Sequence, residues 1–214
     1  MDQPTLITVA QQTTIEQTIK KSRFIATIAP ISSEVAANQV INEVKSSLPK
    51  ATHHVYAYVL GDHNEITRQS DDGEPSGTAA SPVLNVITND NLHNVIIIVT
   101  RFFGGIKLGA GGLIRAYGSS ASLVVNQAPR LQRQSLTAYQ ISLNYDQAEP
   151  LMNWLTERVV NIDHVDYGAA VTLTLLLESS DDTFETDLMN QTNGRAQILE
   201  TMPTTAWIPY QSKN

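Results

Sequence analysis

The sequence predicts an α+β protein built from two domains. The chain has 214 residues, 42% of them hydrophobic, which is enough to bury a sizeable core and suits two small domains. Segments with the spacing of strands and helices run up to Pro129, and a second series of such segments begins after residue 136. Five glycines between an apolar run and a helix-like segment make the first domain the candidate for a functional site.

The first domain opens with strands. Residues 5–31 alternate and are rich in β-branched side chains, which predicts two or three strands with turns near Gln12 and Lys21. Ser32 and Ser33 are N-cap candidates for a helix whose apolar residues recur up to Leu48. The runs "HHVYAYVLG" and "EITRQS" then predict two strands joined by the turn "GDHN".

The rest of this domain alternates loops and regular structure. After the loop "DDGEPSG" we expect a short helix in "TAASPVLNVIT", with Pro82 in its first turn and Ser76 or Thr78 as its N-cap. The continuous apolar run from Val95 to Val99 is typical of a buried strand. A helix with its apolar face starting at Leu113 is expected to end before Pro129.

The second domain has its own pattern. A strand in "YQISLNY", a helix in "DQAEPLMNWLTER", strands in "VVNIDHVDYG" and "AAVTLTLLLE", a helix in "SDDTFETDLMNQTNG" and a strand in "AQILETMPTTAWI" give the order βαββαβ. That order is the ferredoxin-like arrangement. We place the boundary between Pro129 and Thr137, so that the domains are residues 1–132 and 137–214.

Composition excludes several classes of protein. The chain has no cysteine, which removes disulfides, thiolate catalysis and cysteine metal sites. Its opening lacks the features of a signal peptide, and no apolar run approaches the roughly 20 residues that span a bilayer. We therefore expect a soluble cytoplasmic protein with no membrane partner.

Charge is distributed unevenly along the chain. The net charge is -7, yet no Asp or Glu occurs between Asp90 and Asp146. That window contains five cations: Arg101, Lys107, Arg115, Arg130 and Arg133. The pattern predicts a locally basic face in the first domain and an acidic second domain, through which a protein partner is an open alternative.

The glycine-rich stretch lies inside this window. Glycine allows the backbone to approach a ligand, and a loop that leads into a helix can present several N–H groups to an anion at the positive end of the helix dipole. We therefore predict a nucleic-acid or anion site at Arg101, Gly104, Gly105, Lys107, Gly109, Gly111, Gly112 and Arg115. The alternative is a tight packing loop with solvated cations.

Known phosphate-binding motifs do not fit this stretch. A Walker motif requires Ser or Thr after the lysine, whereas Leu108 follows Lys107. A Rossmann motif that begins at Gly109 would need its third glycine at Ile114.

A second loop groups residues capable of chemistry: Asp71, Asp72, Gly73, Glu74, Ser76 and Thr78, with His54 on a neighbouring strand. The carboxylates suit Mg²⁺ or acid–base roles, although adjacent residues such as His53 and His54 point to opposite faces of a regular strand. "GEPSG" lacks the GxSxG spacing of a hydrolase, and the histidines lack metal-ligand spacing. We expect no catalytic residue and no cofactor or metal, with Mg²⁺ left open.

Four blocks together resemble one family. "KKSRFIA" (20–26), "HHVYAYVLG" (53–61), "SDDGEPSGTA" (70–79) and "VTRFFGGIKLGAGGLIRAYG" (99–118) resemble the signature of the IMPACT family in its bacterial YigZ-like branch. The resemblance implies a first domain of the ribosomal protein S5 domain 2-like class, similar to domain IV of elongation factor G. It also implies a second domain similar to domain V of that factor.

For function, the resemblance implies a translation-associated protein that binds RNA or the ribosome. Eukaryotic members regulate translation with the help of an additional N-terminal domain, for which we expect no room before the first block at Lys20. We predict a non-enzymatic, regulatory RNA binder. The alternative is an enzyme that acts on a small phosphorylated or carboxylated ligand at the glycine loop, with Asp71, Asp72 or Glu74 as acid, base or Mg²⁺ ligand.

Overall fold

The chain forms two compact units. The computed structural model describes residues 6–178, 181 and 183–210. The first unit runs to Gln132 and also includes Pro209 and Tyr210, whereas the second comprises residues 133–208. Both units combine helices with a β-sheet, in agreement with the predicted mixture of α and β structure. No helix within these described ranges is both long and apolar enough to cross a membrane.

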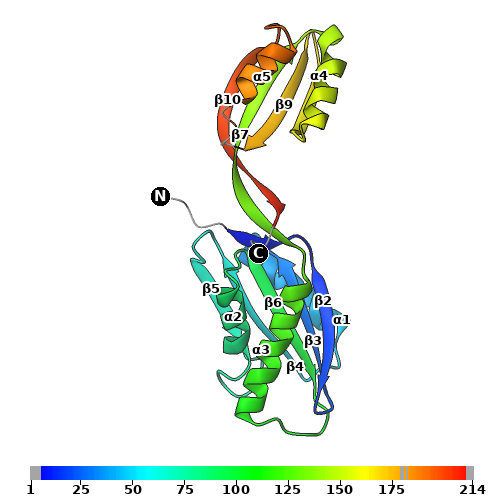
Figure 1. Cartoon of the computed structure of the whole chain (residues 1–214). Coiled ribbons are helices and arrows are strands. Elements are labelled where there is room, and N and C mark those ends of the chain that lie inside the picture. Colours follow the sequence, from blue (N-terminus) through cyan, green and yellow to red (C-terminus); the bar gives the residue numbers. More distant parts are fainter. Residues whose placement is uncertain (1–5, 179–180, 182, 211–214) are drawn as a thin grey trace. The chain divides into compact units, whose positions relative to one another are not determined.

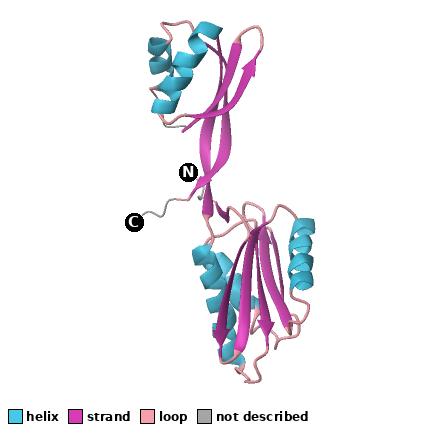
Figure 2. Cartoon of the chain, turned by 90° about the vertical axis from the view of Figure 1, so that its right-hand side faces the viewer, coloured by secondary structure: helices cyan, strands magenta, loops and turns pink. Residues whose placement is uncertain are grey.

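A five-stranded antiparallel sheet is the centre of the first unit, in the order β2-β3-β6-β4-β5 (Figure 1). The strands are β2 (Thr13–Ile19), β3 (Ser22–Pro30), β4 (His53–Leu60), β5 (Ile66–Ser70) and β6 (Val95–Phe102). Helix α1 (Glu34–Ser47) covers one face, and helices α2 (Ala80–Asn89) and α3 (Ala110–Gln127) cover the other (Figure 2). The central strand β6 is therefore buried on both faces, which explains its continuous apolar sequence.

Side chains of β6 alternate between two cores. Ile96 and Ile98 pack with α1, whereas Ile97 and Val99 pack with α2 and α3. Because strand side chains alternate with a period of two, Arg101 lies on the face that α2 and α3 cover. The alternation of side chains along β6 therefore places the charge of Arg101 beneath these helices.

Local sequence signals set the ends of several elements. The predicted N-cap Ser33 is confirmed, because its hydroxyl accepts a hydrogen bond of 3.1 Å from the Ala36 N–H. Strands β2 and β3 are joined by a two-residue turn, in which Lys20 and Lys21 have φ of 44° and 66°. Positive φ at both positions is typical of a type I′ hairpin, whose twist matches that of the strands. Both lysine side chains are exposed at this turn.

The second unit has the predicted order of elements. Its helices are α4 (Tyr145–Glu157) and α5 (Phe184–Gln191), and its strands are β7 (Arg130–Leu143), β8 (Asn161–Tyr167), β9 (Val171–Glu178) and β10 (Gln197–Pro209). The strands lie in the order β10-β7-β9-β8. Alternate residues of β9, from Val171 to Leu177, are buried beneath the helices with Leu151, Leu155 and Phe184.

The connection between the predicted domains differs from the prediction. We expected residues 130–136 to connect two separate series of strands and helices, but strand β7 runs through these residues without a break. Strand β1 (Ile7–Val9) pairs antiparallel with Arg130–Gln132, and the N–H of Tyr210 donates to the Arg130 carbonyl. These distant partners hydrogen-bond to residues 130–132, so the start of the segment is a strand rather than a loop.

Candidate functional site

The glycine loop, residues 103–109, connects β6 to α3, and its glycines serve different purposes. Gly105 and Gly109 have φ of 84° and 70°, a conformation that glycine adopts without strain. Gly104 instead allows a close approach: a Cβ on it would lie 2.5 Å from the Ser22 backbone nitrogen and closer still to the Lys21 carbonyl oxygen. The β2–β3 turn and the glycine loop are therefore in direct backbone contact.

The first turn of α3 has N–H groups that find no acceptor inside the helix. The first hydrogen bond within the helix runs from the Leu113 N–H to the Gly109 carbonyl, at 2.9 Å. The N–H groups of Ala110, Gly111 and Gly112 precede that bond and have no acceptor inside the helix. Gly111 and Gly112 thus occupy the position predicted for anion-binding donors.

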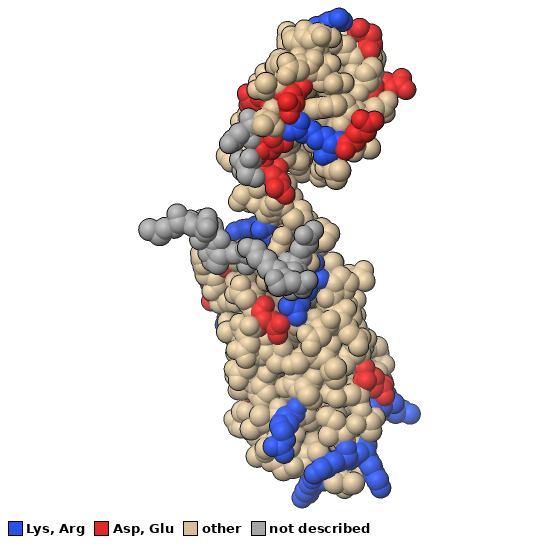
Figure 3. All heavy atoms as spheres, in the orientation of Figure 1, with Lys and Arg blue, Asp and Glu red and all other residues tan. Residues whose placement is uncertain are grey.

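Four exposed cations lie on the hairpin, the glycine loop and α3. Lys20 and Lys21 come from the hairpin, Lys107 from the glycine loop and Arg115 from α3. The Arg115 guanidinium lies along the first turn of its helix, 3.9 Å from the position of a Cβ on Gly111. Figure 3 shows Lys and Arg side chains gathered at the lower end of the first unit, where the hairpin and the glycine loop lie in Figure 1. We call these four residues the basic tip.

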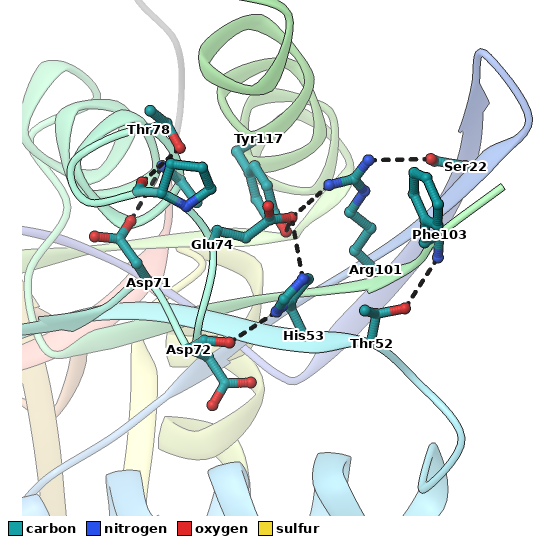
Figure 4. Close-up of polar contacts among 12 residues, drawn as sticks. Ser22, Thr52, His53, Asp71, Asp72, Glu74, Thr78, Arg101, Phe103 and Tyr117 are labelled. Atoms are coloured by element: carbon teal, nitrogen blue, oxygen red, sulfur yellow. Dashed lines mark hydrogen bonds and ion pairs between the residues drawn. The ribbon is translucent and has the colours of Figure 1, made fainter. Parts of the chain in front are cut away.

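Arg101 is placed differently from the other predicted cations. It is 5% exposed, and its Nη1 donates to Glu74 Oε1 at 2.6 Å (Figure 4). Its Nη2 donates to Ser22 Oγ at 3.3 Å, and the same oxygen accepts the Gly104 N–H at 3.2 Å. The charge of Arg101 is therefore neutralised inside the unit, where it supports the junction between hairpin and loop.

Glu74 is the centre of a buried polar cluster. This glutamate is 8% exposed, and its Oε1 also accepts the hydroxyl of the fully buried Tyr117 at 2.7 Å. Burial, followed by the neighbouring Glu74 carboxylate, raises the pKa of Tyr117, so its hydroxyl stays protonated and acts as a donor. The cluster joins the second loop, β6 and α3, with Glu74 as the shared acceptor.

Asp71 orders the rest of the second loop. Its Oδ1 accepts the N–H groups of Ala79 and Ala80 at 3.1 and 2.8 Å, and its Oδ2 accepts the Gly77 N–H at 2.9 Å. The expectation that Ser76 or Thr78 caps α2 is wrong. The N-cap residue is Ala79, which has no side-chain acceptor, and the carboxylate of Asp71 supplies the missing acceptor from a distance.

The two histidines of β4 separate, as strand geometry requires. The His53 ring lies on the side of Glu74, with Nε2 3.9 Å from Glu74 Oε1 and Nδ1 2.8 Å from the Asp72 carbonyl. His54 points to the other face, where Nδ1 is 3.0 Å from Thr100 Oγ1. Burial lowers the pKa of His54 and favours its neutral form. His54 is joined to the second loop by its backbone N–H, which donates to Asp72 Oδ2 at 2.6 Å.

The remaining predicted residues of the second loop lie in a turn, form a local hydrogen bond or are exposed. Asp72 and Gly73 adopt φ of 46° and 89° at the turn. The Thr78 hydroxyl donates to the Pro75 carbonyl at 2.6 Å, and Ser76 is exposed. In the described part of the chain, no group of three or more His, Asp or Glu side chains is arranged to hold a metal ion.

Loss of the Asp71 carboxylate is expected to weaken the first unit. Partial burial alone would raise the pKa of Asp71, but hydrogen bonds from the N–H groups of Ala80, Gly77 and Ala79 outweigh burial and lower it. A lowered folded-state pKa means that the stabilisation is complete above the ordinary value of 3.8 and is lost as the pH falls through the folded-state pKa. We expect Asp71→Ala to cost about 1–2 kcal/mol at neutral pH, measured by urea unfolding.

The amide variant serves as the pH control for this prediction. Asp71→Asn retains one acceptor oxygen and cannot titrate, so the difference between it and the native protein should shrink below pH 3.8. A difference that does not change between pH 6 and pH 3 would contradict the role given to the carboxylate.

Sequence comparisons place these features in a known family. Residues 20–125 match the Impact N-terminal domain, and residues 141–195 match a domain of unknown function, DUF1949. IMPACT family member YvyE of Bacillus subtilis is 38% identical over 186 residues, which cover 86% of both chains. The chain belongs to the IMPACT family. All eight residues of the predicted anion site, and the buried cluster around Glu74, lie within the Impact N-terminal match.

Further IMPACT relatives extend the comparison. IMPACT family member YigZ of Escherichia coli is 34% identical over 200 residues, covering 91% of this chain and 96% of that protein. Human Protein IMPACT is 30% identical over 95 residues, which are 43% of this chain and 30% of the human protein. A solved structure described as a hypothetical protein superposes with a TM-score of 0.59 at 29% identity and covers 98% of each chain.

Several residues of the site were missed by sequence reasoning. Tyr117, Ser22, Lys20 and Lys21 were not among the predicted site residues, and of the two histidines considered for the second loop the prediction named His54 instead of His53. The alternation of side chains along β6 and β4 could have placed Arg101 and His53 on the same covered face of the sheet. The contact between hairpin and glycine loop had no local signal apart from Gly104 itself.

Proposed function

We propose that the first unit binds RNA, as part of a regulatory role in translation, through the phosphates that meet the basic tip. The observation that carries this proposal is the direct contact between the β2–β3 turn and the glycine loop, which places the hairpin with Lys20 and Lys21 against the loop that carries Lys107 and leads into α3. Exposed cations from three elements form an open surface, which suits a polyanion better than a single small ligand. Eukaryotic IMPACT proteins regulate translation, which supports a role in translation for this chain.

The enzyme alternative has less support from the geometry. It requires acidic side chains that are free for chemistry or for Mg²⁺. Asp71 instead accepts three backbone N–H groups, and Glu74 is held by Arg101 and Tyr117. Both carboxylates therefore have structural partners, which favours a binding role for this surface.

The finer fold assignment belongs to the same proposal. The order βαββαβ, with strands in the sequence β10-β7-β9-β8, supports a ferredoxin-like second unit. An S5 domain 2-like first unit and a domain V-like second unit would make the two units resemble domains IV and V of elongation factor G. That likeness supports ribosomal RNA as the first RNA to test.

A salt titration of RNA binding tests the proposal. The native protein should bind ribosomal RNA fragments, and log K should fall with log salt concentration with a slope of about -3, as expected for four cations that contact phosphates. Lys21→Ala combined with Lys107→Ala should weaken binding at low salt at least tenfold and reduce the slope to about -1.5. Arg101 is left unchanged because it is buried and paired.

A charge-matched control makes this test specific. Arg68→Ala combined with Arg195→Ala removes the same charge from exposed ion pairs with Glu34 and Asp146. That control should remain folded, because exposed ion pairs contribute little to stability. It should bind RNA within about twofold of the native protein. Equal losses in the two double variants would mean that net charge, and not the basic tip, governs binding.

A further inference from the structure

An exposed aromatic ring lies in the glycine loop. Phe103 is 47% exposed, although it directly follows the buried strand β6. Its backbone is fixed, because its N–H donates to Thr52 Oγ1 at 3.1 Å (Figure 4). The next residue, Gly104, is held against the hairpin. The ring is therefore presented from a rigid backbone position.

The ring has a cation on its inner side. The guanidinium carbon of Arg101 lies 5.4 Å from the centre of the Phe103 ring, and the same guanidinium is held by Glu74 and Ser22. The Arg101 side chain is 6% exposed, so the cation and the ring are ordered together without a ligand. Contact with this fixed cation lowers the entropic cost of positioning the Phe103 ring as an aromatic platform.

The surroundings of the ring match a nucleotide. Lys107 lies four residues away along the loop, and Lys21 lies at the backbone contact with Gly104. A nucleotide offers an apolar base face beside an anionic phosphate, which is the combination that an exposed ring among cations can bind. A lipid surface or an acidic peptide would use the cations without requiring a flat ring face.

We propose that Phe103 stacks an unpaired nucleobase of RNA while the phosphates of that strand contact the basic tip. This inference rests on the proposed function and narrows it to single-stranded or looped RNA. In a duplex the bases stack on each other, so their faces are not available to an aromatic side chain. Stacking tolerates any base, so the expected recognition is for unpaired character rather than for sequence.

Three RNA ligands of about 12 nucleotides separate stacking from charge: an unstructured single strand, the same strand with abasic sugars, and a duplex. Phe103→Leu keeps an apolar cover over Arg101 but removes the ring. We expect it to weaken binding of the single strand about tenfold. Binding of the abasic strand and of the duplex should change by less than about twofold, because both bind through phosphates.

A fluorescent variant gives a direct readout of stacking. Phe103→Trp places a tryptophan at the platform, and the native tryptophans, Trp154 and Trp207, both lie in the second unit. The added fluorescence should be quenched by the single strand and left unchanged by the abasic strand. This signal also decides the question if Phe103→Leu proves to be unstable, because a merely structural ring would not distinguish the two ligands.

The outcomes separate the inference from the function on which it rests. If Phe103→Leu affects all three ligands equally, or if the tryptophan is not quenched, the stacking inference is overturned while RNA binding by the basic tip stands. If the native protein binds none of the three ligands at low salt, the proposed function falls and the inference falls with it.

Discussion

Replacing Glu74 with alanine is expected to destabilise the first unit by about 3–5 kcal/mol. The Glu74 side chain is 4% exposed and pairs with Arg101, whose side chain is 6% exposed. Truncation leaves a buried guanidinium without its counter-charge, and it also removes the acceptor of the buried Tyr117 hydroxyl. Urea unfolding followed by far-UV circular dichroism would measure the loss.

Two controls show whether burial causes this effect. Glu16 pairs with Arg23 on the surface of the same unit, where their side chains are 50% and 47% exposed, so Glu16→Ala should cost no more than about 1 kcal/mol. Tryptophan fluorescence reports on the second unit, which contains Trp154 and Trp207, and its transition should move less than the circular dichroism signal. Equal costs for the two alanine variants would refute the central role of the buried pair.

Most elements of the fold could be predicted because their signals are local. The apolar spacing behind Ser33 predicts α1, and the apolar run from Val95 predicts β6. The strand through residues 130–136 could not be predicted in this way, because its backbone is satisfied by partners from the start and the end of the chain. Pairing between distant segments leaves no periodic signal within either segment.

The candidate site shows the same division between local and distant signals. The glycines and the start of α3 were located from composition and position alone. The pairing of Glu74 with Arg101 joins residues 27 positions apart, and from the sequence each appeared free to meet a ligand. Only the alternation of side chains along β6 indicated the burial of Arg101, since Arg101 lies on the same face of the strand as Ile97 and Val99.

Replacing Gly104 with alanine is the other change from which we expect a large effect. The new Cβ would collide with backbone atoms of Lys21 and Ser22, which cannot swing aside as a side chain can. Either the hairpin or the glycine loop must move, at a cost of about 1–3 kcal/mol. The movement would also break the hydrogen bond from the Gly104 N–H to Ser22 Oγ and shift the hairpin that carries Lys21 away from the loop that carries Lys107. We therefore expect RNA binding to fall to the level of the Lys21 and Lys107 double variant.

Two other glycines distinguish close approach from backbone conformation. A Cβ on Gly111 would meet only the flexible end of Arg115, at 3.9 Å, and alanine keeps the backbone N–H donor. Gly111→Ala should therefore keep RNA binding within about twofold of the native protein and stabilise α3 by up to about 1 kcal/mol. A Cβ on Gly105 would meet nothing within 4 Å, but its φ of 84° makes alanine cost about 1–2 kcal/mol through strain alone. If binding is lost in Gly104→Ala and kept in Gly111→Ala, contact between hairpin and loop builds the basic tip. If Gly104→Ala binds normally, the cations act separately and the joined surface is not required.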